Sequence, residues 1–536
     1  MINKINKIYL PIIFAAVLIV GILLGKALND NPQRSYAQMY HSTDKLGKII
    51  DYIETSYVDT ISRAKLEESA IPAILEELDP HSIYISASEM KRVSEDMRGN
   101  FEGIGVVFNH QKDTAIIISV ISGGPSNKVG VLAGDRIIKV NDTLIAGKNI
   151  PSNDVVGMLK GEKGTKVRVS LERRGVSDLI EVEIIRDEIP LYSVDVSYMI
   201  DEEIGYVKIN RFAETTYKEF VEGIVKLKKL GLNKLILDLR GNTGGYMVAA
   251  TNIVDQFLES DKMIVYTEGK ASPKQEIFST AKGVCKDIEL VILQDEFSAS
   301  ASEILAGAIQ DNDRGTIIGR RSFGKGLVQE PHALSDGSVI RLTIARYYTP
   351  TGRSIQKPYS EDKNDYYNDL VERYHNGEFS EADSIHFADS LKYITPAGNI
   401  VYGGGGIMPD IFVPLDTTGY TKYYAETVRK GILYNFAFEY VDKNRNELIN
   451  FEDAYTINDY LESINIFNQF ADYAAENGVP KTTKGFQYSK KLVNTQLKAN
   501  IARNVIDNEG FYPIIQEVDT TLRIAISYFK KEKEKI

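Results

Sequence analysis

The chain has little cysteine and no excess of positive charge, and each shortage excludes a class of function. Its one cysteine, Cys285, cannot form a disulfide within the chain and has no partner at metal-ligand spacing, so we interpret it as a buried structural thiol. Lys and Arg number 63 against 74 Asp and Glu, which gives a formal net charge of -11. This balance argues against a nucleic-acid partner. No metal or organic cofactor is indicated by any residue spacing.

Long apolar runs are confined to the amino terminus. Lys4 and Lys7 precede an uncharged stretch from Ile8 to Gly25, which is just long enough to cross a bilayer. A cleaved signal peptide is the alternative, but the nearest small-residue site, Ser35-Tyr36-Ala37, lies well beyond the apolar stretch. We therefore expect residues 1–30 to be a signal anchor in the inner membrane, with the body of the protein in the periplasm of the cell envelope.

The next two regions differ in periodicity. Residues 31–99 carry apolar residues at helical spacing and predict a helical domain, with turn residues at Asp79-Pro80-His81. We assign His81 no chemistry, because a histidine after a proline in a turn more often makes a structural hydrogen bond. Residues 100–187 consist of short β-branched runs separated by glycine-containing turns, which predicts a compact β-rich module.

The β-rich module resembles a PDZ domain of the type found in bacterial proteases. The resemblance rests on the segment Phe101 to Val106, on Gly123-Gly124-Pro125-Ser126, and on Val131 to Ile137. It implies that the loop Gly103, Ile104, Gly105 and Val106 presents backbone N–H groups to the terminal carboxylate of a peptide, while an open strand edge pairs with the peptide itself.

Residues 188–414 alternate apolar strands with helical stretches, which is typical of an α/β core. A polar segment at about 358–394 reads as an insertion into this core. Residues 415–536 are amphipathic and predict a helical C-terminal domain. Within it Asp442-Lys443-Asn444-Arg445-Asn446 has the alternating oxygen ligands of a calcium loop, but Glu447 stands where such a loop requires glycine, so we interpret the run as a turn.

A serine and a lysine flanked by small residues are the candidates for chemistry. Ser300 follows the apolar run Leu290 to Leu293 and begins a helical stretch, as the serine of a nucleophile elbow does. Lys325 stands between two glycines. A hydroxyl needs a neighbour that can take its proton, and lysine can do so only when burial lowers its pKa. Each residue alone would more often be a helix cap or a solvated charge, so the hypothesis depends on their occurring together.

Several ordered motifs together resemble the carboxy-terminal processing proteases, a family of tail-specific serine peptidases. They are Asp238 to Gly245, Ser298 to Glu303, Gly319 to Gln329 and Tyr348 to Gly352, and the resemblance covers about residues 31–413. It implies a crotonase/Clp-like α/β protease core with an inserted PDZ domain and helical terminal regions. It also makes Ser300 the nucleophile, Lys325 the general base and Gln329 the residue that orients the lysine amine. Glutamine carries no charge, so it can hold a neutral amine.

An acyl-transfer site also needs donors for the oxyanion. The N–H of Ala301, at a helix start, is one candidate, and the second is Gly244 or Gly245 in a glycine-rich turn after a strand. We interpret Asp238, Arg240 and Glu303 as supporting residues. A Ser-His arrangement with His332 is less favoured, because no carboxylate at recognisable spacing completes it.

These patterns predict a membrane-anchored serine endopeptidase that binds the C-terminus of a protein substrate in its PDZ domain and cleaves near that end. Protein substrates and the membrane are the expected partners, with a homo-oligomer or an adaptor protein as further possibilities. The alternative is a non-catalytic PDZ scaffold that binds peptides, and the presence of Ser300, Lys325 and Gln329 together weighs against it.

Overall fold

The computed structural model describes residues 15–21, 45–111, 113–121, 123–359, 363–385 and 388–533. The chain divides into two compact units, Met1–Leu78 and Asp79–Ile536. Most of the expected anchor from Ile8 to Gly25 lies outside the described residues, which include only 15–21 of it, as helix. No helix within the described ranges is both long and apolar enough to span a bilayer.

The first unit contains two described helices of ordinary length, α3 (Lys45–Ser56) and α4 (Arg63–Glu76). Ser62 caps α4, because its side chain accepts a hydrogen bond from the amide of Lys65. The helical prediction for residues 31–99 fails at Ile83–Ile85 in the second unit, where a short strand, β1, pairs with a strand of the core. The three residues Ile83, Tyr84 and Ile85 are too few to give a periodic signal, so only the distant partner strand reveals them.

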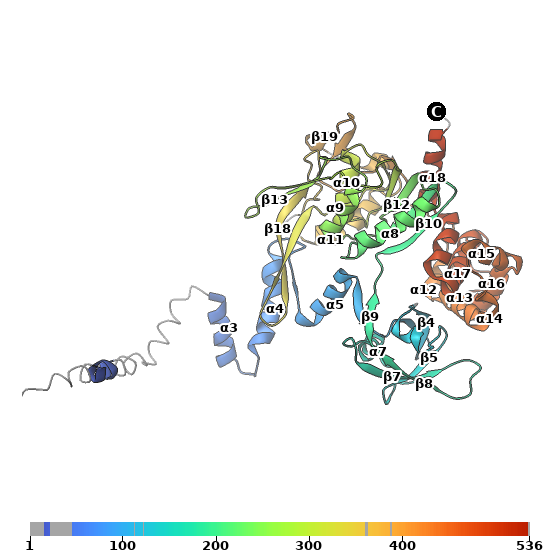
Figure 1. The fold of residues 1–536 in the computed structure, drawn as a ribbon, viewed down its shortest axis with the longest axis horizontal. Helices are drawn as coiled ribbons and strands as arrows, with labels where there is room; N and C mark the ends of the chain where they lie inside the picture. Colours follow the sequence, from blue (N-terminus) through green and yellow to red (C-terminus); the bar gives the residue numbers. More distant parts are fainter. Residues whose placement is uncertain are drawn as a thin grey trace, which may run out of the picture. The chain divides into compact units, whose positions relative to one another are not determined.

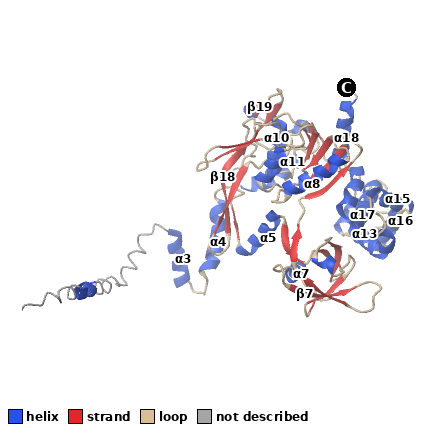
Figure 2. Ribbon diagram, viewed as in Figure 1, coloured by secondary structure: helices blue, strands red, loops and turns tan. Residues whose placement is uncertain are grey.

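The core of the second unit is a six-stranded sheet in the order β10-β11-β12-β15-β16-β21; Figure 1 labels two of its strands, β10 and β12. Its strands are β10 (Val194–Met199), β11 (Ile204–Ile209), β12 (Lys234–Asp238), β15 (Glu289–Gln294), β16 (Thr316–Gly319) and β21 (Ile411–Phe412). All neighbours from β11 to β21 are parallel, and β10 is antiparallel at one edge. Parallel strands are joined by crossover helices, and Figure 2 shows these helices in blue beside the red strands.

Both faces of this sheet are covered. Leu235 and Leu237 of β12 pack in one apolar cluster with α8 (Thr216–Lys229), α9 (Met247–Asp255) and α10 (Ala301–Asp311). Ile236, which points to the opposite face, packs in a second cluster with Phe529 of α18 (Thr520–Lys533). Successive residues of a strand point to opposite faces of the sheet. Because both faces are buried here, every residue of β12 from Leu235 to Leu237 is apolar.

The second unit also contains an antiparallel sheet. Its order is β1-β18-β13-β14, and β17 also pairs with β18. The strands are β13 (Met263–Glu268), β14 (Gln275–Phe278), β17 (Leu327–Ala333) and β18 (Val339–Tyr348). A register shift between Val328 and Gln329 leaves Ile344 of β18 without a partner on β17. Because β1 and β17 both pair with β18, this strand brings residues near 80 and near 329 into one neighbourhood.

The PDZ region is a separate sheet in the order β3-β4-β5-β7-β8, with β6 paired to β5. It contains β3 (Val106–Gln111), β4 (Thr114–Val120), β5 (Arg136–Val140), β6 (Thr143–Leu144), β7 (Lys166–Glu172) and β8 (Ile180–Ile185), with helices α6 (Pro125–Lys128) and α7 (Ser152–Leu159). The pair β2 (Asn100–Gly103) and β9 (Asp187–Pro190) joins the two ends of this region to the core.

The C-terminal region is helical, as expected. Its helices are α12 (Lys422–Arg429), α13 (Ile432–Lys443), α14 (Arg445–Leu448), α15 (Ala454–Ser463), α16 (Ile466–Glu476) and α17 (Lys490–Ile515), and they surround a core that includes Phe436, Phe470 and Leu497. Cys285 is fully buried, which confirms the structural interpretation, and its burial raises the pKa of the thiol to about 11.

Candidate active site

Ser300 stands at the turn between β15 and α10. Its backbone φ is 56° and its ψ is -112°, a conformation that residues other than glycine rarely adopt. Such backbone strain is found where a side chain must be held in a fixed direction. The Ser300 amide donates a hydrogen bond of 2.8 Å to Oε2 of Glu303, three residues further along α10. The turn is therefore sharp and held by its own helix.

Lys325 lies in the loop between β16 and β17. Its Nζ donates to Oε1 of Gln329 at 3.0 Å, so the two residues that the sequence grouped as base and orienting residue touch. The other end of the Gln329 amide is also held, because its Nε2 donates to the backbone carbonyl of His81. The glutamine is thus fixed at both of its polar atoms.

The buried carboxylate of Glu303 joins the two candidate residues. Its Oε2 accepts the amides of Ser300 and Lys325 at 2.8 and 2.9 Å, and its Oε1 accepts from Ser322 and Gly324. A second bridge comes from Tyr347, whose hydroxyl donates to the carbonyl of Ser300 at 3.1 Å and to that of Lys325 at 2.5 Å. The backbones of the predicted nucleophile and base are therefore held next to each other from two sides.

Burial lowers the pKa of the Lys325 amine below its ordinary value, because an ammonium group loses hydration there. The positive charge of Arg341 adds to this effect, whereas the carboxylates of Glu303 and Asp79 oppose it. Burial also raises the pKa of Glu303 to about 7, although the hydrogen bonds that it accepts from Ser322, Lys325, Gly324 and Ser300 work in the other direction. Both shifts reduce charge in the site.

Of the two candidate oxyanion glycines, Gly244 lies against the serine. A Cβ on Gly244 would stand 2.8 Å from Cβ of Ser300 and 3.0 Å from the Ala301 nitrogen, so only glycine permits this approach. The Gly244 amide, however, already donates to Oδ1 of Asn242 at 2.9 Å. Among the described residues, no acceptor takes the amides of Ala301 and Gly245. Of the two glycines, Gly245 is thus the one with a free donor.

The aspartate and arginine before this glycine turn hold it in place. Asp238 is buried and accepts from Arg240, Lys208 and the hydroxyl of Tyr206. Burial opposes ionisation of Asp238, but the charges of Arg240 and Lys208 keep its pKa below the ordinary value. Arg240 also forms two hydrogen bonds to Asp519, at the start of α18. These contacts agree with the supporting role that we expected.

Two residues to which the sequence gave no role in the site, His81 and Tyr366, contact it. The ring of His81, to which we assigned no chemistry, bonds through Nε2 to the hydroxyl of Tyr366 at 2.6 Å, and its carbonyl holds Gln329. Tyr366 belongs to α11 (Lys363–His375) in the polar insertion. No local signal could find these contacts, because the partners are 248 and 285 residues apart. His332, the less favoured alternative base, is exposed on β17.

The predicted peptide-binding loop runs from the end of β2 into β3. Gly105 has a φ of 74°, which is unfavourable for other residues, and Ile104 is buried in the PDZ core. β3 is an edge strand, so one side of it is open to pairing. In the described part of the chain no acceptor takes the amides of Ile104 and Gly105. The loop therefore offers two free donors beside an open strand edge.

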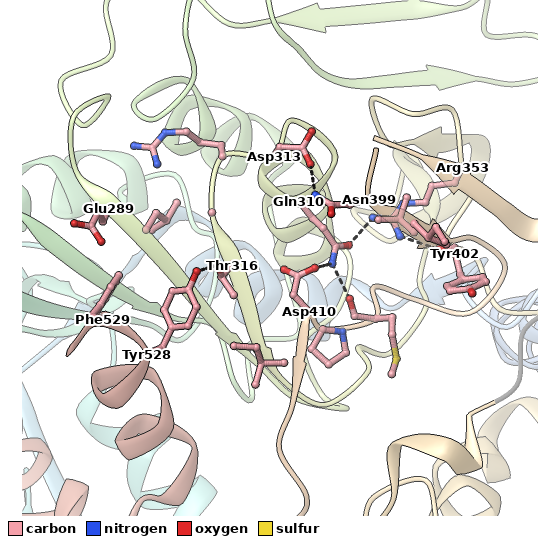
Figure 3. A pocket seen from close by; sticks show the side chains of 18 residues that line it. Glu289, Gln310, Asp313, Thr316, Arg353, Asn399, Tyr402, Asp410, Tyr528 and Phe529 are labelled. Carbon is pink, nitrogen blue, oxygen red and sulfur yellow. Dashed lines mark hydrogen bonds between the residues drawn. The ribbon is translucent and has the colours of Figure 1, made fainter. Parts of the chain in front are cut away.

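A cavity of about 800 Å³ is lined by residues other than the predicted catalytic and peptide-binding ones (Figure 3). Three pairs of its lining residues are hydrogen-bonded: Gln310 donates to Asp410 at 2.7 Å, Asn399 to Asp313 at 2.9 Å, and Thr316 to the hydroxyl of Tyr528 at 2.9 Å. None of the predicted site residues lines it. We assign no ligand to this cavity.

Comparison with known proteins gives the family. Residues 203–363 match the model of peptidase family S41, residues 103–184 match a PDZ domain, and residues 423–507 match a family of unknown function. The carboxy-terminal processing protease CtpA of Bacillus subtilis is 35% identical over 354 residues, which are 66% of this chain and 75% of that protein. The chain belongs to the carboxy-terminal processing proteases of family S41.

A second curated relative agrees with this membership, and one solved structure is reported beside it. The carboxy-terminal-processing protease of Bartonella bacilliformis is 36% identical over 361 residues, which are 66% of this chain and 81% of that protein. A solved photosystem II D1 C-terminal processing protease is 24% identical, covers 68% of this chain and 92% of its own, and has a TM-score of 0.35. The protein is a serine-type C-terminal processing peptidase, and the expected α/β fold class with a PDZ domain is confirmed by the family matches.

Proposed function

We propose that this family S41 peptidase cleaves protein substrates near their C-termini with Ser300 as nucleophile and Lys325 as general base. The observation that carries the proposal is the Glu303 carboxylate, which binds the amides of both residues at 2.8 and 2.9 Å. Because the backbones of both residues bind one buried carboxylate, the two residues stay side by side, which proton transfer between their side chains requires.

The Ser300 hydroxyl oxygen attacks the scissile carbonyl, and the neutral Lys325 amine takes the proton of this hydroxyl. The N–H groups of Ala301 and Gly245 then stabilise the negative oxygen of the tetrahedral intermediate. The lysine returns its proton to the leaving amine, which frees the C-terminal fragment and leaves an acyl-enzyme. A water molecule, deprotonated by the same amine, releases the acyl group. Gln329 keeps the amine in place without favouring its charged form as a carboxylate would.

We also propose that the PDZ domain binds the substrate's C-terminus. The support is the pair of free amides at Ile104 and Gly105 beside the open edge of β3. Backbone amides in such a loop bind a terminal carboxylate, and the strand edge supplies hydrogen bonds to the peptide chain.

The test uses one unfolded protein substrate with an apolar C-terminus in two forms, one with a free terminal carboxylate and one amidated. We expect the wild-type enzyme to cleave the free form and to bind the amidated form at least about 10-fold more weakly, because the amide removes the charge that the loop binds. Cleavage is followed by mass spectrometry and binding by calorimetry with Ser300→Ala. Equal affinity for both forms contradicts the PDZ role.

The same experiment separates the peptidase from the non-catalytic scaffold. A scaffold binds the free C-terminus but leaves the substrate intact, whereas a peptidase produces a fragment in the wild type and none in Ser300→Ala. Binding without any fragment in the wild type therefore rejects the dyad and retains the PDZ proposal.

We further propose that residues 1–30 anchor the protein in the inner membrane with its body in the periplasm. The support is the uncharged stretch from Ile8 to Gly25 after Lys4 and Lys7. After an alkaline carbonate wash, we expect the full chain to stay in the membrane pellet and a chain that starts at residue 31 to appear in the supernatant. Recovery of the full chain in the supernatant contradicts the anchor. Protease added to cells with a permeabilised outer membrane tests the side on which the body lies.

A further inference from the structure

The turn Asp79–Ser82 is a rigid part of the site. The Asp79 carboxylate accepts the amides of His81 at 2.8 Å and of Ser82 at 3.0 Å, and it also accepts from the hydroxyl of Thr343 on β18 at 3.1 Å. Thr343 stands opposite Gln329 in the pairing of β17 with β18. The turn is thus fastened to the strand beside Gln329, and from this place the His81 carbonyl accepts Nε2 of Gln329.

Helix α11 holds the same turn from outside through two successive tyrosines. The hydroxyl of Tyr366 bonds to Nε2 of His81 at 2.6 Å, and the two rings meet edge to face with centroids 5.3 Å apart. The hydroxyl of Tyr367 donates to the carbonyl of Pro80 at 3.3 Å. Tyr366 is buried, whereas Tyr367 is 66% exposed. Each tyrosine therefore binds one of two consecutive residues in the turn.

The helix is itself anchored beside the nucleophile loop. The Lys357 ammonium lies 4.1 Å from the ring centroids of both Tyr366 and Phe323, and it pairs with Asp369 of α11 at 2.9 Å. The amide of Phe323 donates to the carbonyl of Ser298, two residues before the predicted nucleophile. A cation between two aromatic rings attracts both. Helix α11 is thus connected to the loops that carry both predicted catalytic residues.

We propose that α11 is a positioning element for the base, in which Tyr366 and Tyr367 hold the turn so that the His81 carbonyl fixes the Gln329 amide. This inference rests on the proposed Ser300 and Lys325 chemistry. A glutamine amide has an acceptor at one end and donors at the other, and only the acceptor end can bind the lysine N–H. The His81 carbonyl takes the donor end. It therefore keeps Oε1, and not Nε2, directed at the Lys325 amine.

The test is a double-mutant cycle on kcat and KM. We expect Tyr366→Phe, which keeps the ring and removes the hydroxyl, to lower kcat about 3- to 10-fold with KM unchanged, as the loss of one buried hydrogen bond implies. In a Gln329→Ala background the same change should have no further effect, because the residue through which it acts is gone. Tyr367→Phe should act in the same direction with a smaller loss, and it provides a second variant if Tyr366→Phe does not fold.

Tyr374→Phe is the matched control, because Tyr374 is on the same helix and 56% exposed, and the aromatic rings that it contacts among the described residues, His375 and Phe379, are not part of the turn. Its kcat should equal that of the wild type. The proposal is overturned if Tyr366→Phe leaves kcat unchanged, if it lowers kcat equally in the Gln329→Ala background, or if Tyr374→Phe loses as much. Wild-type cleavage that disappears in Ser300→Ala, measured in the same assay, shows that the proposed chemistry holds whichever result is found.

Discussion

Lys325→Ala is expected to lower kcat/KM for cleavage of a protein substrate by about 10²- to 10⁴-fold, the usual contribution of a general base. The Ser300 hydroxyl keeps its place in this variant, because Glu303 and Tyr347 hold its backbone, but the nitrogen that accepts its proton is gone. KM should change little, since the lysine amine contacts Gln329 and not the PDZ loop. Steady-state cleavage followed by mass spectrometry gives both constants.

Two further variants show whether the loss comes from the amine. Lys325→Met keeps the apolar stem and should lose as much activity as Lys325→Ala. Lys270→Ala, at an exposed lysine outside the site, should retain wild-type activity. A Lys325→Met enzyme with more than a tenth of wild-type kcat/KM would mean that another group takes the proton.

Glu303→Gln is expected to destabilise the fold and to remove most activity at once. The carboxylate accepts four hydrogen bonds, and all three of its backbone partners are N–H donors. The amide of glutamine would turn an NH₂ group toward two of these donors, which leaves them unsatisfied in a buried site. We expect a loss of about 2 to 4 kcal/mol in the free energy of unfolding. Because the nucleophile and base would also shift, kcat/KM should fall by about 10²-fold or more.

Urea unfolding and steady-state cleavage measure these two effects separately. Glu330→Gln, at an exposed glutamate on β17, is the matched control and should change neither. A Glu303→Gln protein that is as stable and as active as the wild type would show that the carboxylate does not hold the two loops together.

The sequence predicted the parts of the molecule whose signals are local. The strands at Ile204, Lys234 and Leu290 and the helices between them follow from apolar runs and helical periodicity within short windows. The candidate site followed from Ser300 and Lys325 with their small neighbours. Glu303 was recognised only as a supporting residue. Its second task, to bind the amides of Gly324 and Lys325, depends on a loop that returns from the next strand.

The parts that the sequence could not give depend on contacts across the chain. The strand Ile83–Ile85 forms because it pairs with β18. The hydrogen bond between Tyr366 and His81 joins the polar insertion to a turn that lies 285 residues earlier in the chain. The choice between the two glycines of the expected oxyanion pair could not be made either. Our proposal takes Gly245, because the Asn242 side chain occupies the amide of Gly244.

The central claim is that an uncharged Lys325 amine takes the proton of Ser300. The most direct test is the rate at which a fluorophosphonate modifies Ser300 as a function of pH, with the adduct located by mass spectrometry. We expect the rate to rise with pH through a titration of Lys325 below the ordinary lysine value of 10.5, because burial and Arg341 lower its pKa more than Glu303 and Asp79 raise it. Lys325→Ala should lack this titration and react far more slowly. A Lys325→Ala protein that is labelled at the wild-type rate, with the same pH dependence, would contradict the account.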